Sequence, residues 1–172
     1  CFPPLVATAD DPKVISIQPP ERGFFSKQVF CGGIPIKAHR DVEDAALFEA
    51  RRRISRMLKN LPVVRENLLD VGAEMEIIGK DQQTSDLPSQ RHWKGKTFES
   101  YGGRSLTIDQ RTRGVGGLPA SCGEENLLKL PSDRYRHHRD ICTHEFAHTV
   151  FHYGFSGNVR EMIEAQFEKS TE

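Results

Sequence analysis

One short stretch of the chain carries residue types that can do metal chemistry. It runs from Ile141 to Val150 and contains the pattern His-Glu-x-x-His, formed by His144, Glu145 and His148. In a helix, residues four apart lie on one face, one turn above the other. The spacing therefore predicts two neutral imidazoles that bind one Zn²⁺, with Glu145 placed to take a proton from a zinc-bound water.

The residues that flank this pattern are uncharged, and no proline interrupts them. A helix with such flanks is expected to be buried, and burying two histidines and a glutamate without partners costs free energy. The alternative is a surface helix whose histidines and glutamate merely face solvent. The apolar flanks favour a metal site over that alternative.

The segment His144–His148 resembles the active-site helix of zincin metallopeptidases. The resemblance implies an α+β, zincin-like fold in which a small mixed sheet is backed by a helix and the zinc helix lies below it. It also implies hydrolysis of peptide bonds in a peptide or protein substrate, as an endopeptidase. His144 and His148 would then be the zinc ligands, and Glu145 the general base.

The motif leaves the third zinc ligand open. A metzincin would have glycine at 151 and histidine at 154, but these positions hold Phe151 and Gly154, so the resemblance is to gluzincins instead. His152 lies about 12 Å along the helix axis from His144, at 1.5 Å per residue, which is too far for one ion. His152 is therefore interpreted as lining a cleft or the edge of the core. Tyr153 is a candidate hydrogen-bond donor to a transition-state oxyanion, by resemblance to some zincins.

In gluzincins the third ligand is a glutamate on a later helix. The sequence after Asn158 predicts such a helix, because apolar residues recur there with helical spacing. The apolar stripe comprises Val159, Met162, Ile163 and Phe167. The acidic candidates Glu161, Glu164 and Glu168 lie opposite the stripe, so they face solvent if the stripe packs on the core. Glu164 is the candidate within the chain, and the alternative is a ligand beyond Glu172 in a longer protein.

Periodicity and turn residues predict the elements that must position the zinc helix. The first 40 residues predict strands and turns that belong to the same single domain of 172 residues. A helix capped by Asp41 is expected over 41–60, and a shorter helix over 63–69. Gly154 is expected to end the zinc helix. The predicted strands are 14–17, closed by Pro19 and Pro20, then 28–31, 34–36, 75–78, 105–109 and 126–130.

Two segments between these elements are candidates for a substrate cleft. Residues 80–104 predict a long polar loop whose His92 and Trp93 either line the cleft or anchor the loop to the core. The Gly-rich residues 113–123 predict a flexible turn, without the spacing of a phosphate-binding loop. By resemblance to zincins, the strand at 105–109 or the one at 126–130 would pair with an extended peptide.

Composition narrows the classes of partner. The 172 residues include 24 basic and 24 acidic ones without a block of like charge, so nucleic acid and anionic membranes are not expected as partners. No apolar run approaches the length of a membrane span, about 18 residues. The sequence does not indicate an oligomeric state.

Cys1, Cys31, Cys122 and Cys142 make an even number of cysteines, which predicts disulfides and a secreted protein. Of the three possible pairings we favour Cys1–Cys31 with Cys122–Cys142, because each pair joins neighbouring segments. The alternative is four buried free thiols in a cytosolic protein. A chain that starts at Cys1 rather than Met suggests a mature or trimmed form.

These patterns together favour a secreted zinc metallopeptidase that consists of one zincin-like domain. Two alternatives stay open. One is a zincin-fold metal-binding module, or a toxin-like protein, without hydrolytic activity. The other is a disulfide-stabilised structural protein in which the His-Glu-x-x-His pattern is accidental.

Overall fold

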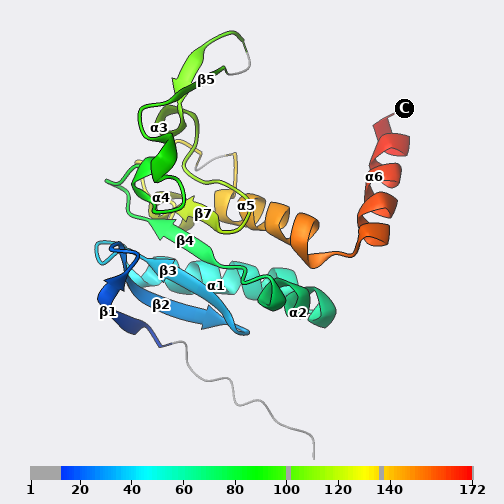
Figure 1. Ribbon diagram of the computed structural model, residues 1–172, viewed down its shortest axis with the longest axis horizontal. Helices are drawn as coiled ribbons and strands as arrows, with labels where there is room; N and C mark the ends of the chain where they lie inside the picture. The colour runs from blue at the N-terminus through cyan, green and yellow to red at the C-terminus, as the bar shows by residue number, and fades with distance from the viewer. Residues whose placement is uncertain (1–12, 100–101, 136–137, 172) are drawn as a thin grey trace, which may run out of the picture.

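The computed structural model describes residues 13–99, 102–135 and 138–171 as an α+β structure (Figure 1). Its centre is a five-stranded sheet with the strand order β1-β2-β3-β4-β7. The strands are β1 Ile15–Glu21, β2 Phe25–Cys31, β3 Ile34–Ala38, β4 Met75–Ile78 and β7 Ala120–Gly123. The pairs β1–β2 and β2–β3 are antiparallel, whereas β3–β4 and β4–β7 are parallel. The predicted α+β class with a small mixed sheet is therefore confirmed.

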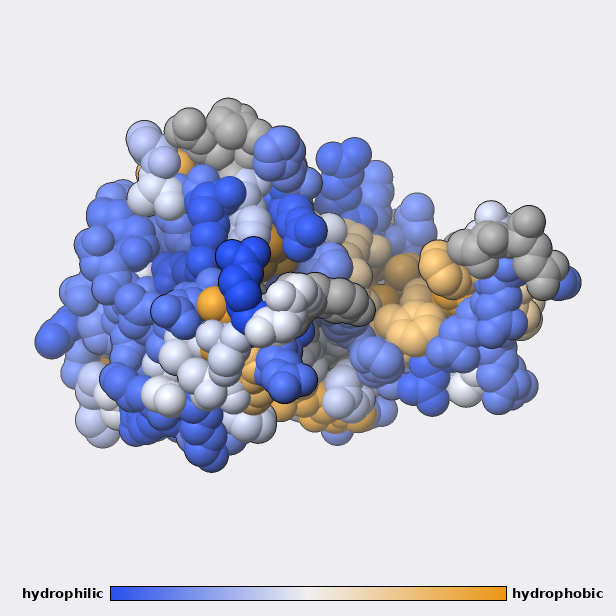
Figure 2. All heavy atoms as spheres, turned by 90° about the horizontal axis from the view of Figure 1, so that it is seen from above, coloured by the Kyte–Doolittle hydropathy of each residue, from blue (hydrophilic) through white to orange (hydrophobic). Residues whose placement is uncertain are grey.

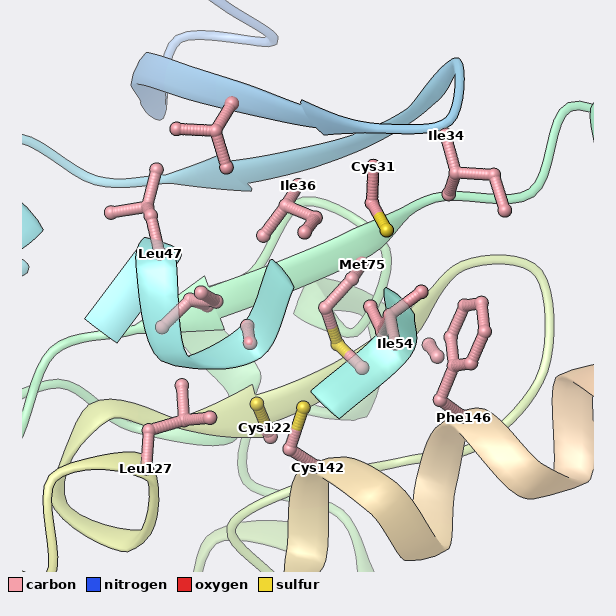
Figure 3. Packing of buried hydrophobic residues seen from close by; sticks show 14 of the residues in the cluster. Cys31, Ile34, Ile36, Leu47, Ile54, Met75, Cys122, Leu127, Cys142 and Phe146 are labelled. Carbon is pink, nitrogen blue, oxygen red and sulfur yellow. The ribbon is translucent and has the colours of Figure 1, made fainter. Parts of the chain in front are cut away.

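Helices α1 Asp44–Leu58 and α2 Pro62–Asp70 connect β3 to β4. Both were predicted from helical periodicity, and α1 buries one side that includes Leu47 and Ile54. A later helix, α5 Ile141–Thr149, shares the same core. Figure 3 shows Ile54 of α1, Met75 of β4 and Phe146 of α5 pointing toward one another. The predicted backing helix and the predicted zinc helix are thus held by one hydrophobic cluster.

A smaller group of elements, which we call the hairpin lobe, comprises the described residues of 84–111. It contains two 3-10 turns, η1 Thr84–Asp86 and η2 Arg91–Trp93, the strands β5 Thr97–Glu99 and β6 Ser105–Thr107, and the short helix α3 Ile108–Arg111. The strands β5 and β6 form an antiparallel hairpin of their own, beyond the sheet (Figure 1). The long polar loop predicted for 80–104 therefore contains regular structure.

Four predicted strands have different boundaries in the structure: β2 starts at Phe25 rather than at 28, β3 ends at Ala38 rather than at 36, and two others change for a local reason. The first strand runs through Pro19 and Pro20, because β1 is an edge strand with an irregular register between Ser16 and Glu21, where proline is tolerated. The strand predicted for 105–109 stops at Thr107, whose side chain accepts a hydrogen bond from the Gln110 backbone and starts α3.

Two other predictions are wrong, and tertiary contacts explain both. Helix α1 starts at Asp44 rather than at the predicted cap Asp41, because the backbone N–H of Glu43 donates to the buried carboxylate of Glu124 at 2.6 Å. The strand predicted for 126–130 is instead the short helix α4 Glu124–Leu127 and the turn after it. The buried side chains of α4 bond to other segments, which extended pairing would prevent.

The helix predicted after Asn158 is present as α6 Gly157–Thr171, but its apolar stripe does not pack on the core. Met162 is 71% exposed and Phe167 is 68% exposed. Figure 2 shows apolar surface, in orange, gathered on this helix at the right of the molecule. Among the residues that the structure describes, no helix is long and apolar enough to cross a membrane.

The cysteines of the core are free thiols in the structure. Cys122 on β7 and Cys142 on α5 are buried with their sulfur atoms facing each other (Figure 3). The hydrogen bond with Cys142, together with burial, raises the pKa of Cys122 well above its ordinary value and keeps it a thiol. The predicted Cys122–Cys142 disulfide is therefore not formed here. Cys31 is also a free thiol, and its predicted partner Cys1 lies outside the described residues.

A cluster of charged residues lies at the sheet around Glu76, whose side chain is fully buried. Glu76 accepts hydrogen bonds from Arg22 at 3.0 Å and from Ser89 at 2.5 Å. Burial nevertheless raises its pKa to about 7, because the partners offset only part of the desolvation of the carboxylate.

Glu76→Gln should remove a pH dependence of the free energy of unfolding. Glu76 keeps its proton up to about pH 7 in the folded chain but only to about pH 4.5 in the unfolded chain. The folded state thus binds more protons between these values, so the contribution of Glu76 to stability falls as pH rises, by about 3 kcal/mol. Urea unfolding at pH 5 and pH 8 should show the variant gaining stability relative to wild type at the higher pH. A difference that is equal at both pH values would contradict this assignment.

Candidate metal centre

The start of α5 is fixed by its N-cap residue. The Asp140 side chain accepts hydrogen bonds from the Thr143 backbone N–H at 3.0 Å and from its hydroxyl at 2.7 Å. Arg53 of α1 pairs with the same carboxylate at 2.6 Å. Burial opposes the charged form, but these hydrogen bonds and the charge of Arg53 together lower the pKa of Asp140. The cap therefore ties α5 to α1.

A second anchor of α5 comes from Asn126 in α4, which the sequence had placed in a strand. The Asn126 side-chain oxygen accepts a hydrogen bond from the Ile141 backbone N–H at 2.8 Å. Its amide nitrogen donates to Asp133 at 2.9 Å and to the Arg139 carbonyl at 3.0 Å. This buried amide fixes where the helix starts, and sequence reasoning missed it because its partners, 7 to 15 residues later, meet it only in the folded chain.

Helix α5 is buried on one side only. Cys142, Phe146 and Thr149 face the core, whereas His144 and His148 are exposed and Glu145 is half-buried. The expectation that the whole helix would be buried is therefore wrong. The two histidines need no buried partners in this position, because water or a bound ligand can satisfy their ring nitrogens.

The two histidines present their Nε2 atoms to the same point in space. These atoms are 3.3 Å apart, and the rings stand at 89° to each other. Two nitrogen ligands about 2.0–2.1 Å from a tetrahedral zinc ion would be separated by about 3.3–3.4 Å. Glu145 adds a carboxylate oxygen, and the ligand atoms of all three residues lie within 4.8 Å of one another. The arrangement therefore fits one tetrahedral metal ion.

A Gly-rich segment, residues 114–117, lies against α5 and is not the flexible turn that the sequence predicted. A Cβ on Gly116 would lie 2.7 Å from the Cβ of His148, and one on Gly114 would lie 2.6 Å from Cγ2 of Ile141. The segment pairs with β7 through Val115 and Ser121. Only glycine permits this close approach of backbone to helix.

Arg113 secures the start of the Gly-rich segment. Its guanidinium binds Glu125 at 2.6 and 2.9 Å and also donates to the carbonyls of Gly79 and Gln82. This buried, bidentate pair explains why the segment holds one position.

The carboxylate of Glu145 lies between the Gly-rich segment and the histidines. Burial raises its pKa, while the nearby His144 and His148 and a hydrogen bond from the Gly116 backbone act in the opposite direction. Gly116 therefore contacts both Glu145 and the helix turn that carries His148, so it positions two parts of the site at once.

A cleft of about 590 Å³ opens beside this group. One wall is the histidine side of α5 and its continuation, a π-helical turn at Val150–Gly154 that carries His152 and Tyr153. The other wall is the hairpin lobe, which contributes Trp93 and Phe98. Of the two interpretations of Trp93, lining the cleft is therefore the one that the structure supports.

The predicted end of the zinc helix has a different physical cause from the one expected. The helical turn does end at Gly154, but its φ is not in the left-handed region. A Cβ there would lie 2.6 Å from Cγ1 of Val64, and Asn67 donates to the Gly154 carbonyl at 2.8 Å. Glycine is needed because α2 packs closely against the turn.

Within the described residues, no histidine, cysteine, aspartate or glutamate besides Glu145 joins the two histidines in this group. The ring centroid of His152 is 6.3 Å from that of His148, and His152 does not belong to the group. Glu161, Glu164 and Glu168 are exposed on α6 and do not belong to it either. Comparisons with protein families, curated proteins and solved structures find no match to this chain. The site geometry therefore carries the functional argument by itself.

Gly116→Ala should disturb the metal centre. The new Cβ would lie 2.7 Å from the Cβ of His148, and neither atom can move without its backbone. We expect the free energy of unfolding to fall by about 1–3 kcal/mol and zinc binding to weaken. Urea unfolding and zinc titration against a chelator measure both effects.

Gly157→Ala is the matched control, because nothing lies within 4 Å of a Cβ at Gly157 and its φ is ordinary. This variant should bind zinc like wild type. If Gly116→Ala behaves in the same way as the control, the close approach is not what positions His148.

Proposed function

We propose that the protein is a zinc-dependent metallopeptidase of the zincin type. The observation that carries the proposal is the 3.3 Å separation of the Nε2 atoms of His144 and His148, which suits two ligands of a tetrahedral zinc ion. The adjacent carboxylate and the open cleft support it. A zinc ion held by these histidines would supply Lewis acidity that polarises a scissile carbonyl and lowers the pKa of water.

Three residues of the chain have proposed roles in the reaction. Glu145 accepts the proton of the attacking water and then delivers it to the nitrogen of the leaving amine. The Gly116 backbone packs against α5 at Glu145, where an added Cβ would lie 3.1 Å from the Glu145 carbonyl oxygen. Tyr153 lines the same cleft and can donate its hydroxyl hydrogen to the oxygen on which negative charge develops.

The cleft also favours an endopeptidase over an exopeptidase. Its walls come from two separate groups of elements, α5 with its π-helical turn and the hairpin lobe, so an extended peptide can lie between them. The secreted location was predicted from the even number of cysteines and the disulfides that it suggests. The three described cysteines are free thiols, so the secreted location remains a prediction.

A second candidate function is metal binding without hydrolysis, as a zincin-fold binding module or toxin-like protein. One observation favours it: within the described residues, only two histidines and Glu145 form the ligand group. Such a protein would bind zinc but would cleave no peptide.

Glu145→Gln should separate the general base from the metal ligands. Glutamine keeps the shape of the side chain but cannot accept the proton, so we expect near-normal zinc content and hydrolysis reduced by about 10²-fold or more. His144→Ala should lose zinc and activity together, because one ligand nitrogen is gone. Zinc content and peptide turnover are measured on the same preparations.

Glu164→Gln is the control, since it makes the same chemical change on an exposed carboxylate. It should change neither zinc content nor turnover, and loss of zinc would restore Glu164 as a ligand. Equal turnover by wild type and Glu145→Gln would overturn the mechanism. Zinc binding without turnover of any peptide by wild type would favour the metal-binding module.

A further inference from the structure

The wall of the cleft that faces the histidines is apolar and aromatic. Trp93 of η2 and Phe98 of β5 are half-buried, and their rings meet edge to face with centroids 4.8 Å apart. Ile108 of α3 lies beside them and is 8% exposed. A pair of aromatic rings fixed in this way offers an angled apolar surface to a bulky side chain.

Two basic side chains stand at this wall, because the Nζ of Lys96 lies over the Trp93 ring, 5.4 Å from its centroid. Arg111, the last residue of α3, lines the cleft and is exposed. Among the described residues that line the cleft, it is the one arginine or lysine, and Glu145 is the one carboxylate. An incoming peptide therefore meets a cation on the hairpin lobe and an acid on α5.

The guanidinium of Arg111 also differs from the arginines that hold the site together. Arg113 binds Glu125 and Arg53 binds Asp140, so their charges are already compensated within the fold. Within the part of the chain that the structure describes, the Arg111 guanidinium makes no hydrogen bond or ion pair. Its planar donors remain available for a carboxylate, which they can bind in a bidentate manner.

We infer that the cleft prefers peptides that bring a carboxylate to Arg111 and place a bulky apolar side chain against Trp93 and Phe98. This inference rests on the proposed peptidase function, because it names the substrate class of the same cleft. Arg111 acts as a specificity residue and takes no part in bond breaking. Neutral peptides of the same size lack a partner for this cation, and basic ones are repelled by it.

The carboxylate can come from two sources. It can be the side chain of an aspartate or glutamate next to the apolar residue, or the C-terminal carboxylate of a short peptide. Both present the same planar anion to the guanidinium. A set of peptides that differ only in this group distinguishes the two sources.

Trp93 provides a direct measure of binding, because it is the single tryptophan of the chain and lies in the cleft. Short phenylalanine-containing peptides without tryptophan or tyrosine are titrated into the zinc-loaded Glu145→Gln protein while its fluorescence is recorded. One peptide carries a glutamate and a C-terminal amide, and a second replaces that glutamate with glutamine. A third, also without glutamate, ends in a free carboxylate.

The glutamate peptide, the peptide with a free C-terminal carboxylate, or both should bind about 10-fold or more tightly than the neutral peptide. Arg111→Gln should abolish that difference. In Arg111→Glu the preference should reverse, so that a peptide with lysine in place of the glutamate binds more tightly than the carboxylate peptides. Arg56→Gln is the matched control, because Arg56 is exposed on α1 and does not line the cleft. Equal affinities of all three peptides for the Arg111-containing protein, or absence of binding, would overturn the inference.

Turnover of the same peptides by the protein with Glu145 intact tests the peptidase function separately. The ratio of kcat/KM for carboxylate and neutral peptides should fall about 10-fold in Arg111→Gln and stay unchanged in Arg56→Gln. If the peptides bind with the expected dependence on Arg111 but are not cleaved, the carboxylate preference stands and the peptidase function fails. If all of them are cleaved equally well, the peptidase function stands and the preference fails.

Discussion

The close contact between a glycine backbone and a helix is the constraint on which the rest of the site depends. The side of α5 that faces the core is held there by Cys142 and Phe146. This packing lets the other side present two imidazoles and a carboxylate. The Gly-rich segment then approaches the turn that carries His148 so closely that a Cβ at Gly116 would overlap it. A Cβ at Gly116 would also lie 3.1 Å from the Glu145 carbonyl oxygen, so one close contact constrains the turns that carry both residues.

Three polar residues fix the positions of α5 and of the Gly-rich segment, and so maintain the contact between them. Asp140 and Asn126 fix the first turn of α5, and Arg113 fixes the start of the Gly-rich segment through Glu125. Each of these side chains is bonded on more than one side. The hydrogen bonds of Asn126 and Arg113 are buried, and they specify one arrangement, because leaving a buried member unpaired costs free energy. The α5 wall is therefore built on well-supported elements, and the hairpin lobe forms the opposite wall.

The two walls of the cleft carry residues with different proposed roles, one for chemistry and one for selecting what binds. The α5 wall carries the residues proposed for chemistry, which require fixed positions. The hairpin lobe carries an aromatic pair and an uncompensated cation, which are groups that select what binds. The sequence signals for the second wall are weak. Trp93 could be flagged by its size, but Phe98 and Arg111 have no pattern that marks them, since they come together only when the chain folds back.

The sequence by itself determined that α1, α2, β4 and the helix with the His-Glu-x-x-His spacing form, and for α1 the reason is its helical periodicity. It also brought together His144 and His148 as candidate metal ligands, because residues four apart meet through helix geometry alone. Tertiary structure decided the rest. The stripe of α6 is exposed because it does not pack on the core. The start of α1 and the helical state of residues 124–127 depend on partners distant in sequence. Local propensity is too small, at under about 1 kcal/mol per residue, to oppose such contacts.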